Sequence, residues 1–150
     1  MAIREMRFKD DEILSKVCKE VKVFDERLHI LLDDMYETMQ KYEGVGLAAP
    51  QVGILKRAAV IDVGDGKLEL INPEIVETEG TQNGSEGCLS VPQVFGEVER
   101  PMHVKVKAQD RNGKWFYAEG DELLARAICH ECEHLDGHLF LEKVTKFIED

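Results

Sequence analysis

Two histidines and a glutamate stand close together in the stretch His130-Glu-Cys-Glu-His134. On a helix, residues four apart lie about 40° from each other around the axis and one turn along it. Both imidazoles then face one ion, while Glu131 lies to the side, where its carboxylate reaches the outer shell of the ion. The motif predicts a divalent metal site of the kind that activates water for hydrolysis.

A hydrolytic metal site needs a third protein ligand and an open position for water. The metzincin pattern would place a third histidine at position 140, but this residue is Phe140, and His138 comes two residues too early. We expect His138 to lie on the surface or behind the ligands. Cys88 is the best candidate for the third ligand. The small and glycine-rich residues 84–92 favour a shaped loop, or a strand broken by a tight turn, that presents a thiolate.

The four cysteines allow a second interpretation. Nothing in the sequence indicates secretion, so no disulfide framework is expected. Cys129 and Cys132 form a C-x-x-C pair that suits structural zinc or redox chemistry, although such a site leaves Glu131 without a role. Cys18 is expected to be buried as a small apolar residue.

A third segment, residues 43–53, combines three glycines, two alanines and a proline. Small residues let another chain or a ligand approach the backbone closely. Gln51 is its only side chain with both a donor and an acceptor. The segment lacks the lysine and the glycine spacing of a phosphate-binding loop. Its composition fits a tight structural loop as well as a binding segment.

Two helices are expected to position these groups. Asp25 can cap the first, whose apolar stripe recurs every three or four residues until Gly44. The members of this stripe are Leu28, Leu31, Leu32, Met35, Met39 and Tyr42. Asp121 can cap the second helix, which carries the histidine motif and ends at Gly137. Leu123 and Ala127 continue the histidine face and give the site an apolar wall.

The middle of the chain has the two-residue alternation that is typical of strands. Candidate strands cover residues 58–63, 67–71, 74–79, 102–109 and 114–119. Trp115 fills the core or lines a sheet face, and residues 142–150 are long enough for only a short helix. We therefore expect an α+β fold, in which mostly antiparallel sheets pack on helices and residues 1–150 form a single domain.

Composition excludes several classes of partner. The chain has 150 residues and a formal net charge of -11, which argues against DNA or an anionic membrane as the main partner. No stretch approaches the roughly 18 apolar residues of a membrane span, and residues 1–12 contain no apolar run. We expect a soluble, cytoplasmic protein.

The three segments together resemble the signature motifs of the peptide deformylase family. They read Gly44-Val-Gly-Leu-Ala-Ala-Pro-Gln51, Glu86-Gly-Cys-Leu-Ser90 and His130-Glu-x-x-His134, and the resemblance extends over essentially the whole chain. It implies an α+β fold in which antiparallel strands surround a central metal-bearing helix. It also implies a hydrolase that removes the formyl group from N-terminal formylmethionine of nascent polypeptides and releases formate.

The resemblance implies roles for individual residues. It makes Cys88, His130 and His134 the ligands of a divalent ion, with water in the fourth position. It makes Glu131 the general base and then the general acid. Two groups stabilise the developing oxyanion: the Gln51 amide and the backbone N–H of Leu89.

The substrate contacts are implied in the same way. The backbone around Val45 and Gly46 pairs with the extended peptide. An apolar pocket beside the helix takes the methionine side chain, and Val45, Leu123 and Ala127 help to line it.

The resemblance further implies one divalent metal ion per chain. Fe(II), which a thiolate and two imidazoles can bind, is the expected ion in the cell, and Zn, Ni or Co are expected in isolated protein. The partners are formylmethionyl nascent peptides near the ribosome exit, with no DNA and no membrane, and the protein is expected to be a monomer.

Two residues depart from the family pattern. Family members usually have Gln before the first histidine and Asp before the second, where this chain has Cys129 and Glu133. Changing groups that orient metal ligands costs about 10–100-fold in metal affinity or activity. A further hypothesis is that Arg100 pairs with Glu86 and braces the cysteine segment.

Two other functions are weighed against this one. A metallopeptidase that cleaves internal bonds would lack its usual third ligand. A non-enzymatic metal or thiol module would use Cys129 and Cys132, and would make Cys88 and Gln51 dispensable.

Overall fold

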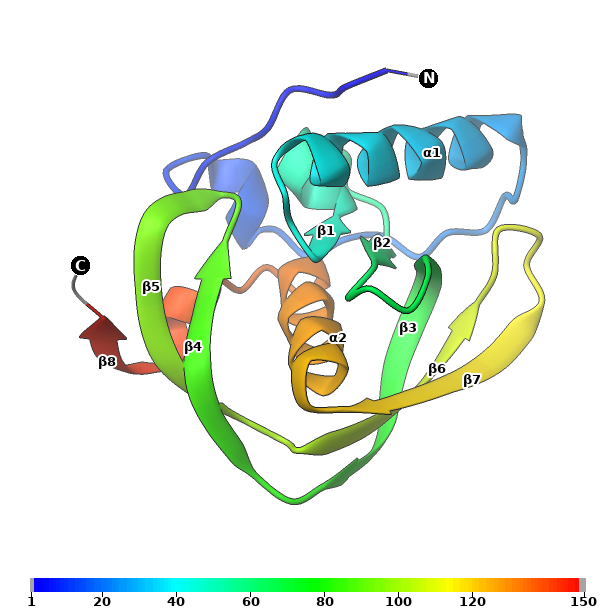
Figure 1. Cartoon of the computed structure of the whole chain (residues 1–150). Coiled ribbons are helices and arrows are strands. Elements are labelled where there is room, and N and C mark those ends of the chain that lie inside the picture. Colours follow the sequence, from blue (N-terminus) through cyan, green and yellow to red (C-terminus); the bar gives the residue numbers. More distant parts are fainter. Residues whose placement is uncertain (1, 149–150) are drawn as a thin grey trace.

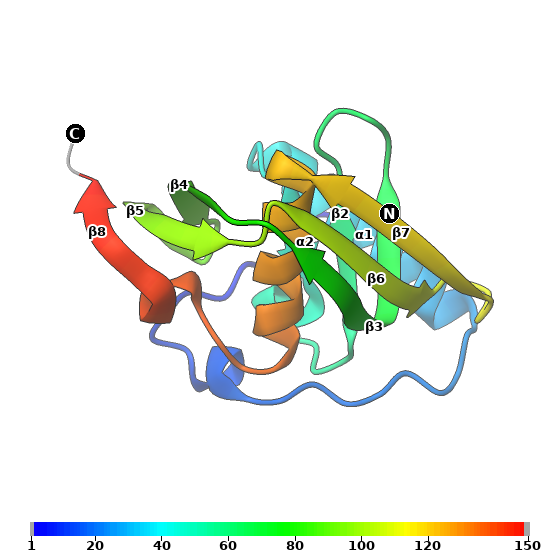
Figure 2. The same cartoon turned by 90° about the horizontal axis from the view of Figure 1, so that it is seen from below.

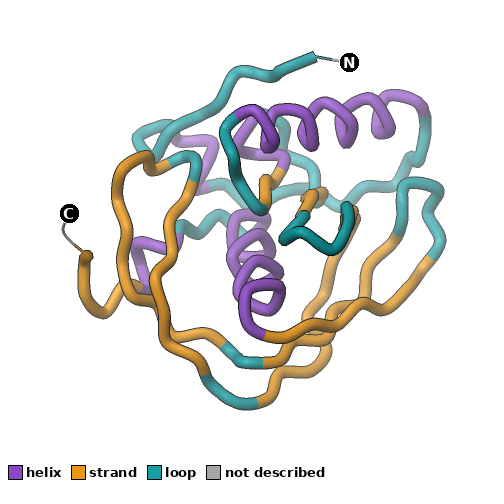
Figure 3. Tube along the Cα trace, viewed as in Figure 1, coloured by secondary structure: helices purple, strands orange, loops and turns teal. Residues whose placement is uncertain are grey.

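The structure is a computed structural model that describes residues 2–148. Helix α2 (Glu122–Leu135) lies in the centre of the molecule, and strands pass on both sides of it (Figure 1). Seen from below, the two sheets lie on opposite sides of this helix (Figure 2). Helix α1 (Glu26–Lys41) covers the top of the molecule (Figure 3). This arrangement confirms the α+β expectation.

The larger sheet has five antiparallel strands in the order β1-β2-β3-β6-β7. Its strands are β1 (Gly46–Ala48), β2 (Ala58–Ile61), β3 (Leu68–Glu79), β6 (His103–Gln109) and β7 (Trp115–Asp121). The strands expected at residues 67–71 and 74–79 are one strand, β3, with register shifts after Ile71 and Ile75. Trp115 lies on an exposed sheet face, with Lys107 above its ring, and is not a core residue.

The smaller sheet has three antiparallel strands in the order β4-β5-β8. Its strands are β4 (Gln82–Cys88), β5 (Val91–Arg100) and β8 (Val144–Ile148). Residues 84–92 are therefore two strands joined by a tight turn, which is the second of the two expected forms. The short helix expected over residues 142–150 is wrong. A 3₁₀ turn (Phe140–Lys143) leads into β8, because β5 offers it a pairing edge, and residues 149–150 lie outside the described part.

Helix α1 follows the expected cap and stripe. The Asp25 carboxylate accepts a hydrogen bond from the N–H of Leu28, and the buried residues are Leu28, Leu31, Leu32, Asp34, Met35, Thr38 and Met39. Their apolar members pack against β1, β2 and the N-terminal segment. Tyr42 leaves the stripe, because the helix ends before it and its side chain is 45% exposed.

Helix α2 is buried along most of its length because it lies between the two sheets. Its Ala125 and Ile128 pack on the larger sheet, and a polar set of side chains faces the smaller one. The expected side-chain cap is absent, because Asp121 bonds to Nδ1 of His103 at 2.6 Å instead. Gly137 ends the helix with a φ of 84°, and a Cβ there would lie 2.7 Å from the carbonyl oxygen of Ser15.

Two short 3₁₀ turns complete the chain, at Glu12–Ser15 and at Ala49–Val52. The second follows β1 directly, so residues 43–53 hold an edge strand and a turn where composition indicated only a loop. Within residues 2–148, no helix has the length and apolar character that crossing a membrane requires.

Candidate metal centre

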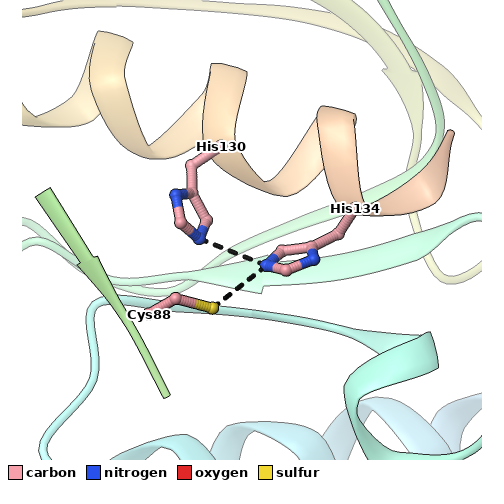
Figure 4. Close-up of side chains that lie close together, drawn as sticks. All are labelled: Cys88, His130 and His134. Atoms are coloured by element: carbon pink, nitrogen blue, oxygen red, sulfur yellow. Dashed lines mark hydrogen bonds between the residues drawn. The ribbon is translucent and has the colours of Figure 1, made fainter. Parts of the chain in front are cut away.

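Three potential ligands meet between α2 and the end of β4. Nε2 of His134 lies 3.3 Å from Sγ of Cys88 and 3.2 Å from Nε2 of His130 (Figure 4). The ligand atoms of the three residues all lie within 4.8 Å of one another. One thiolate and two imidazoles suit a divalent transition-metal ion, so the donor set fits the metal that the sequence motif predicts.

Two elements place the three groups. The helical spacing of four residues puts both imidazoles on one side of α2, as expected. Cys88 is the last residue of β4, and the pairing with β5 shifts register between Glu86 and Cys88. A bulge of this kind re-aims side chains.

A buried carboxylate holds the first histidine. Oε2 of Glu86 accepts from Nδ1 of His130 at 2.7 Å, which leaves Nε2 of that ring to face the other ligands. Arg100 donates to both Glu86 oxygens, at 3.1 and 2.6 Å. Burial acts to raise the pKa of Glu86, but the hydrogen bonds from His130 and Arg100 outweigh it and lower the pKa to about 2.

Arg126 also reaches this carboxylate, and sequence analysis did not identify it. Its Nη1 lies 3.0 Å from Oε1 of Glu86. The signal in the sequence was a charged residue one turn before His130 on an otherwise apolar helix face, but it did not reveal the partner. Charged side chains are rarely buried without one.

Glu131 is buried beside the ligands. Its side chain faces Gly46 on β1, and among the described residues its Oε1 has no hydrogen-bond partner. Burial raises the pKa of Glu131 to about 7. Burial also lowers the pKa of His134 well below its usual value, which favours the neutral imidazole that binds metals.

Gln51 lies on the other side of the thiol. Its Nε2 donates to Oγ of Ser90 at 3.0 Å and lies 3.5 Å from Sγ of Cys88. Its Oε1 accepts from the N–H of Ala48 at 2.9 Å, which fixes the orientation of the amide. Leu89 follows Cys88 in the turn and packs against the core below α1. Ser90 is a further contact that the sequence did not single out.

A cavity of about 710 Å³ opens in front of these groups. Gln51, Cys88, His130 and Glu131 belong to its lining. All four residues expected to contact substrate also line it, namely Val45, Gly46, Leu123 and Ala127. Further apolar lining was not foreseen and comes from distant segments, for example from Met6, Phe8, Tyr42 and Phe95.

The two departures from the family pattern have different surroundings. Glu133 accepts from Arg100 at 2.7 Å and from Lys143 at 2.6 Å. Cys129 is buried against the larger sheet, and burial raises its pKa to about 11. Its thiol makes no hydrogen bond to the ligand groups in the described part of the chain.

The alternative C-x-x-C site finds no support in the geometry. Burial raises the pKa of Cys132 to about 12, which disfavours the thiolate that a metal needs. Within residues 2–148, the group of side chains that can share an ion includes neither Cys129 nor Cys132. Cys18 is buried as expected, and His138 is exposed next to Glu142.

Comparison with known proteins gives one consistent result. The family model described as Polypeptide deformylase matches residues 3–149. A peptide deformylase of Acetivibrio thermocellus is 62% identical over 150 residues, which cover 100% of this chain and 88% of the relative. One of Caldicellulosiruptor bescii is 59% identical over the whole chain and 90% of its own length.

Solved structures agree. The crystal structure of peptide deformylase from Thermotoga maritima has a TM-score of 0.93 and 44% identity, covering 95% of this chain and 98% of that one. A peptide deformylase from Synechococcus elongatus in complex with actinonin has a TM-score of 0.92 and 42% identity, covering 95% and 79%.

The fold and the site define a metal-dependent hydrolase in which a buried H-E-x-x-H helix faces a cysteine from a neighbouring strand. The chain belongs to the peptide deformylase family. Its activity is the removal of the N-terminal formyl group from nascent peptides.

Proposed function

We propose that Cys88, His130 and His134 together bind the divalent ion of this enzyme, and that the ion in the cell is Fe(II). The meeting of these three donors beside the buried Glu131 carboxylate carries the proposal. A bound divalent ion supplies Lewis-acid chemistry, since it polarises a carbonyl and makes water acidic near neutral pH. The soft thiolate together with two imidazoles suits iron and zinc alike.

Glu131 moves the proton. It takes one from the water that attacks the formyl carbon, and passes it to the amine nitrogen as the C–N bond breaks, so that formate and a free methionine amine result. A pKa of about 7 suits both tasks at neutral pH, because a group that acts first as base and then as acid works best when its pKa lies near the working pH. The Oε1 atom of Glu131, which has no hydrogen-bond partner among residues 2–148, can accept that proton.

Gln51 and the backbone N–H of Leu89 stabilise the negative charge that develops on the formyl oxygen. Gln51 suits this role because Ala48 holds its carbonyl and turns its NH₂ group toward Cys88. A fixed donor needs no reorganisation when the charge develops. Leu89 adjoins Cys88, so its backbone is anchored to the ligand itself.

The substrate lies along the cavity as an extended strand. β1 and β4 stand at the ends of their sheet orders, and residues of both line the cavity, so the peptide has a strand edge on either side. Val45 and Gly46 offer backbone groups from the β1 side. Leu123 and Ala127 on α2 form part of the apolar pocket for the methionine side chain.

We further propose that residues 1–150 act as a single catalytic domain and as a monomer in the cytoplasm, close to the ribosome exit. The family match over residues 3–149 supports a single unit. Activity on nascent peptides supports a location close to the ribosome exit, because formylated N-termini first appear where the chain leaves the ribosome. A short apolar peptide end needs no electrostatic capture, which is consistent with the net charge of -11.

The test is anaerobic purification followed by measurement of bound metal and of formate release from a formyl-Met dipeptide. Cys88→Ala is expected to lose the metal. Glu131→Ala is expected to keep the metal and lose activity, and Cys18→Ala, which removes a buried thiol outside the group of potential ligands, is the control. Metal retention by Cys88→Ala would contradict the ligand set, and wild-type turnover by Glu131→Ala would contradict the proton path. Reloading with Fe(II), Zn(II), Ni(II) or Co(II) then compares the metals.

A further inference from the structure

The Glu86 carboxylate accepts four hydrogen bonds, two on each oxygen. Oε1 accepts from Nε of Arg100 at 3.1 Å and from Nη1 of Arg126 at 3.0 Å. Oε2 accepts from Nη2 of Arg100 at 2.6 Å and from Nδ1 of His130 at 2.7 Å. Each oxygen therefore has one donor from β5 and one donor from α2.

Arg126 is built into this contact. The residue is only 6% exposed, and its Nη1 also donates to the carbonyl of Val98 on β5 at 3.0 Å. Gly84 on β4 makes room for the guanidinium, since a Cβ there would lie 3.2 Å from Nη2. A buried charge placed this tightly must gain enough from its partners to offset the loss of its water shell.

We propose that Arg126 is a positioning residue of the metal centre, which acts through Glu86 on His130. The inference rests on the proposed ligand set. Arg126 and His130 are four residues apart on the same helix and contact opposite oxygens of one carboxylate. Arg126 thus fixes Glu86 relative to α2, whereas Arg100 fixes it relative to β5.

The charges of the cluster support this assignment. Arg100 is shared, because its Nη1 also donates to Glu133 at 2.7 Å. Arg126 therefore gives Glu86 a second cationic partner that is not shared with Glu133. Among the described residues, the only other contact of the Glu86 side chain with the helix is the imidazole that it orients. The groups that orient metal ligands typically account for about 10–100-fold in metal affinity.

The experiment measures Co(II) and Zn(II) affinity by competition with a chromophoric chelator, together with the visible spectrum of the Co(II) protein. Arg126→Met keeps the length of the side chain and removes its charge and donors. Its affinity is expected to fall about 10–100-fold, with a changed Co(II) spectrum. Arg126→Lys keeps the charge as a compact ammonium without the planar guanidinium, and is expected to recover part of the affinity.

Arg57→Met is the matched control. Arg57 also contacts α2, through the carbonyl of Leu135 and the carboxylate of Asp136, but it does not reach Glu86. Arg57→Met is expected to lower the thermal stability of the metal-free protein without changing the metal affinity or the Co(II) spectrum. If Arg126→Met does not fold, the Lys variant decides the question, because lysine keeps the charge but lacks the planar guanidinium that holds Nη1 against both Glu86 and Val98.

Folded Arg126 variants with wild-type affinity and spectrum would overturn the inference. Cys88→Ser is measured in parallel to separate this failure from failure of the ligand set. If Cys88→Ser also binds the metal normally, the proposed ligands are wrong. If Cys88→Ser loses the metal while both Arg126 variants keep it, only the role of Arg126 is wrong.

Discussion

Replacement of Gly46 by alanine tests whether the position of the Glu131 carboxylate determines the rate. A Cβ at position 46 would lie 3.0 Å from Cδ and 3.1 Å from Cγ of Glu131, and closer still to Oε2. Favourable contacts between carbon atoms lie at about 3.5–4.0 Å, so the carboxylate must retreat by about 0.5–1 Å. The missing side chain of Gly46 thus leaves room for the Glu131 carboxylate, to which we assign the proton transfer.

A misplacement of about 1 Å at a reacting group can cost about 100-fold in rate. Gly46→Ala is therefore expected to lower kcat by up to about 100-fold, or about 2.7 kcal/mol of activation free energy. The bound metal is expected to be unchanged, because the three atoms nearest to the new methyl group all belong to Glu131 and not to a ligand. Steady-state formate release from a formyl-Met dipeptide gives kcat and KM separately.

Two further variants separate this effect from a general steric cost. A Cβ at Gly96 meets Val144 at 2.5 Å in the packing of β5 on β8, so Gly96→Ala introduces a similar clash away from Glu131. It is expected to lower thermal stability and to keep kcat. Glu131→Asp shortens the side chain and relieves the clash. It is therefore expected to lower kcat less in the Gly46→Ala enzyme than in the wild type. A folded Gly46→Ala enzyme with wild-type kcat would refute the reasoning.

Three more predictions concern stability and the network around the ligands. Asp25→Ala removes the cap at the N–H of Leu28 and is expected to cost about 1 kcal/mol in denaturant unfolding, with no change in kcat. Arg100→Ala removes two donors from the buried Glu86 carboxylate, so bound metal and activity are both expected to fall. Unchanged metal content would contradict the hypothesis that Arg100 holds Glu86 and the cysteine segment in place. The hydrogen bond to Asp121 raises the pKa of His103 above its ordinary value of 6.5. The folded protein therefore holds that proton more tightly. His103→Gln removes this contribution to stability. The loss is expected to be complete below about pH 6.5 and to vanish as the pH rises through the raised pKa of His103. Unfolding measured as a function of pH tests this.

Local signals in the sequence predicted the elements well where no distant partner competes. Asp25 caps α1 as its position indicated, because its carboxylate has no stronger partner nearby. Asp121 has the same position before α2 but does not cap it, because His103 from a neighbouring strand takes the carboxylate. Residues 144–148 form a strand because β5 pairs with them, and composition carries no information about that partner.

The same distinction holds at the site. The spacing of His130 and His134 predicts a shared face from one helix alone. The contact of Arg126 with Glu86 joins residues from two elements, and helical periodicity says nothing about which strand faces the helix. The cavity lining from Phe8 and Phe95 was missed for the same reason, since these residues come from segments far apart in the chain.

The proposed ligands come from the end of β4 and from the second half of α2, two elements that no hairpin connects. An unfolded chain does not hold Cys88 next to the two histidines, so an ion is expected to bind the native protein in strong preference. By mass action, free metal at 100 times its dissociation constant stabilises the native state by about 2.7 kcal/mol. That amount is a large part of the 5–15 kcal/mol that separates a typical domain from its unfolded chain. If the metal binds as proposed, the metal supply of the cell is expected to affect how long this protein survives proteolysis as well as how fast it works.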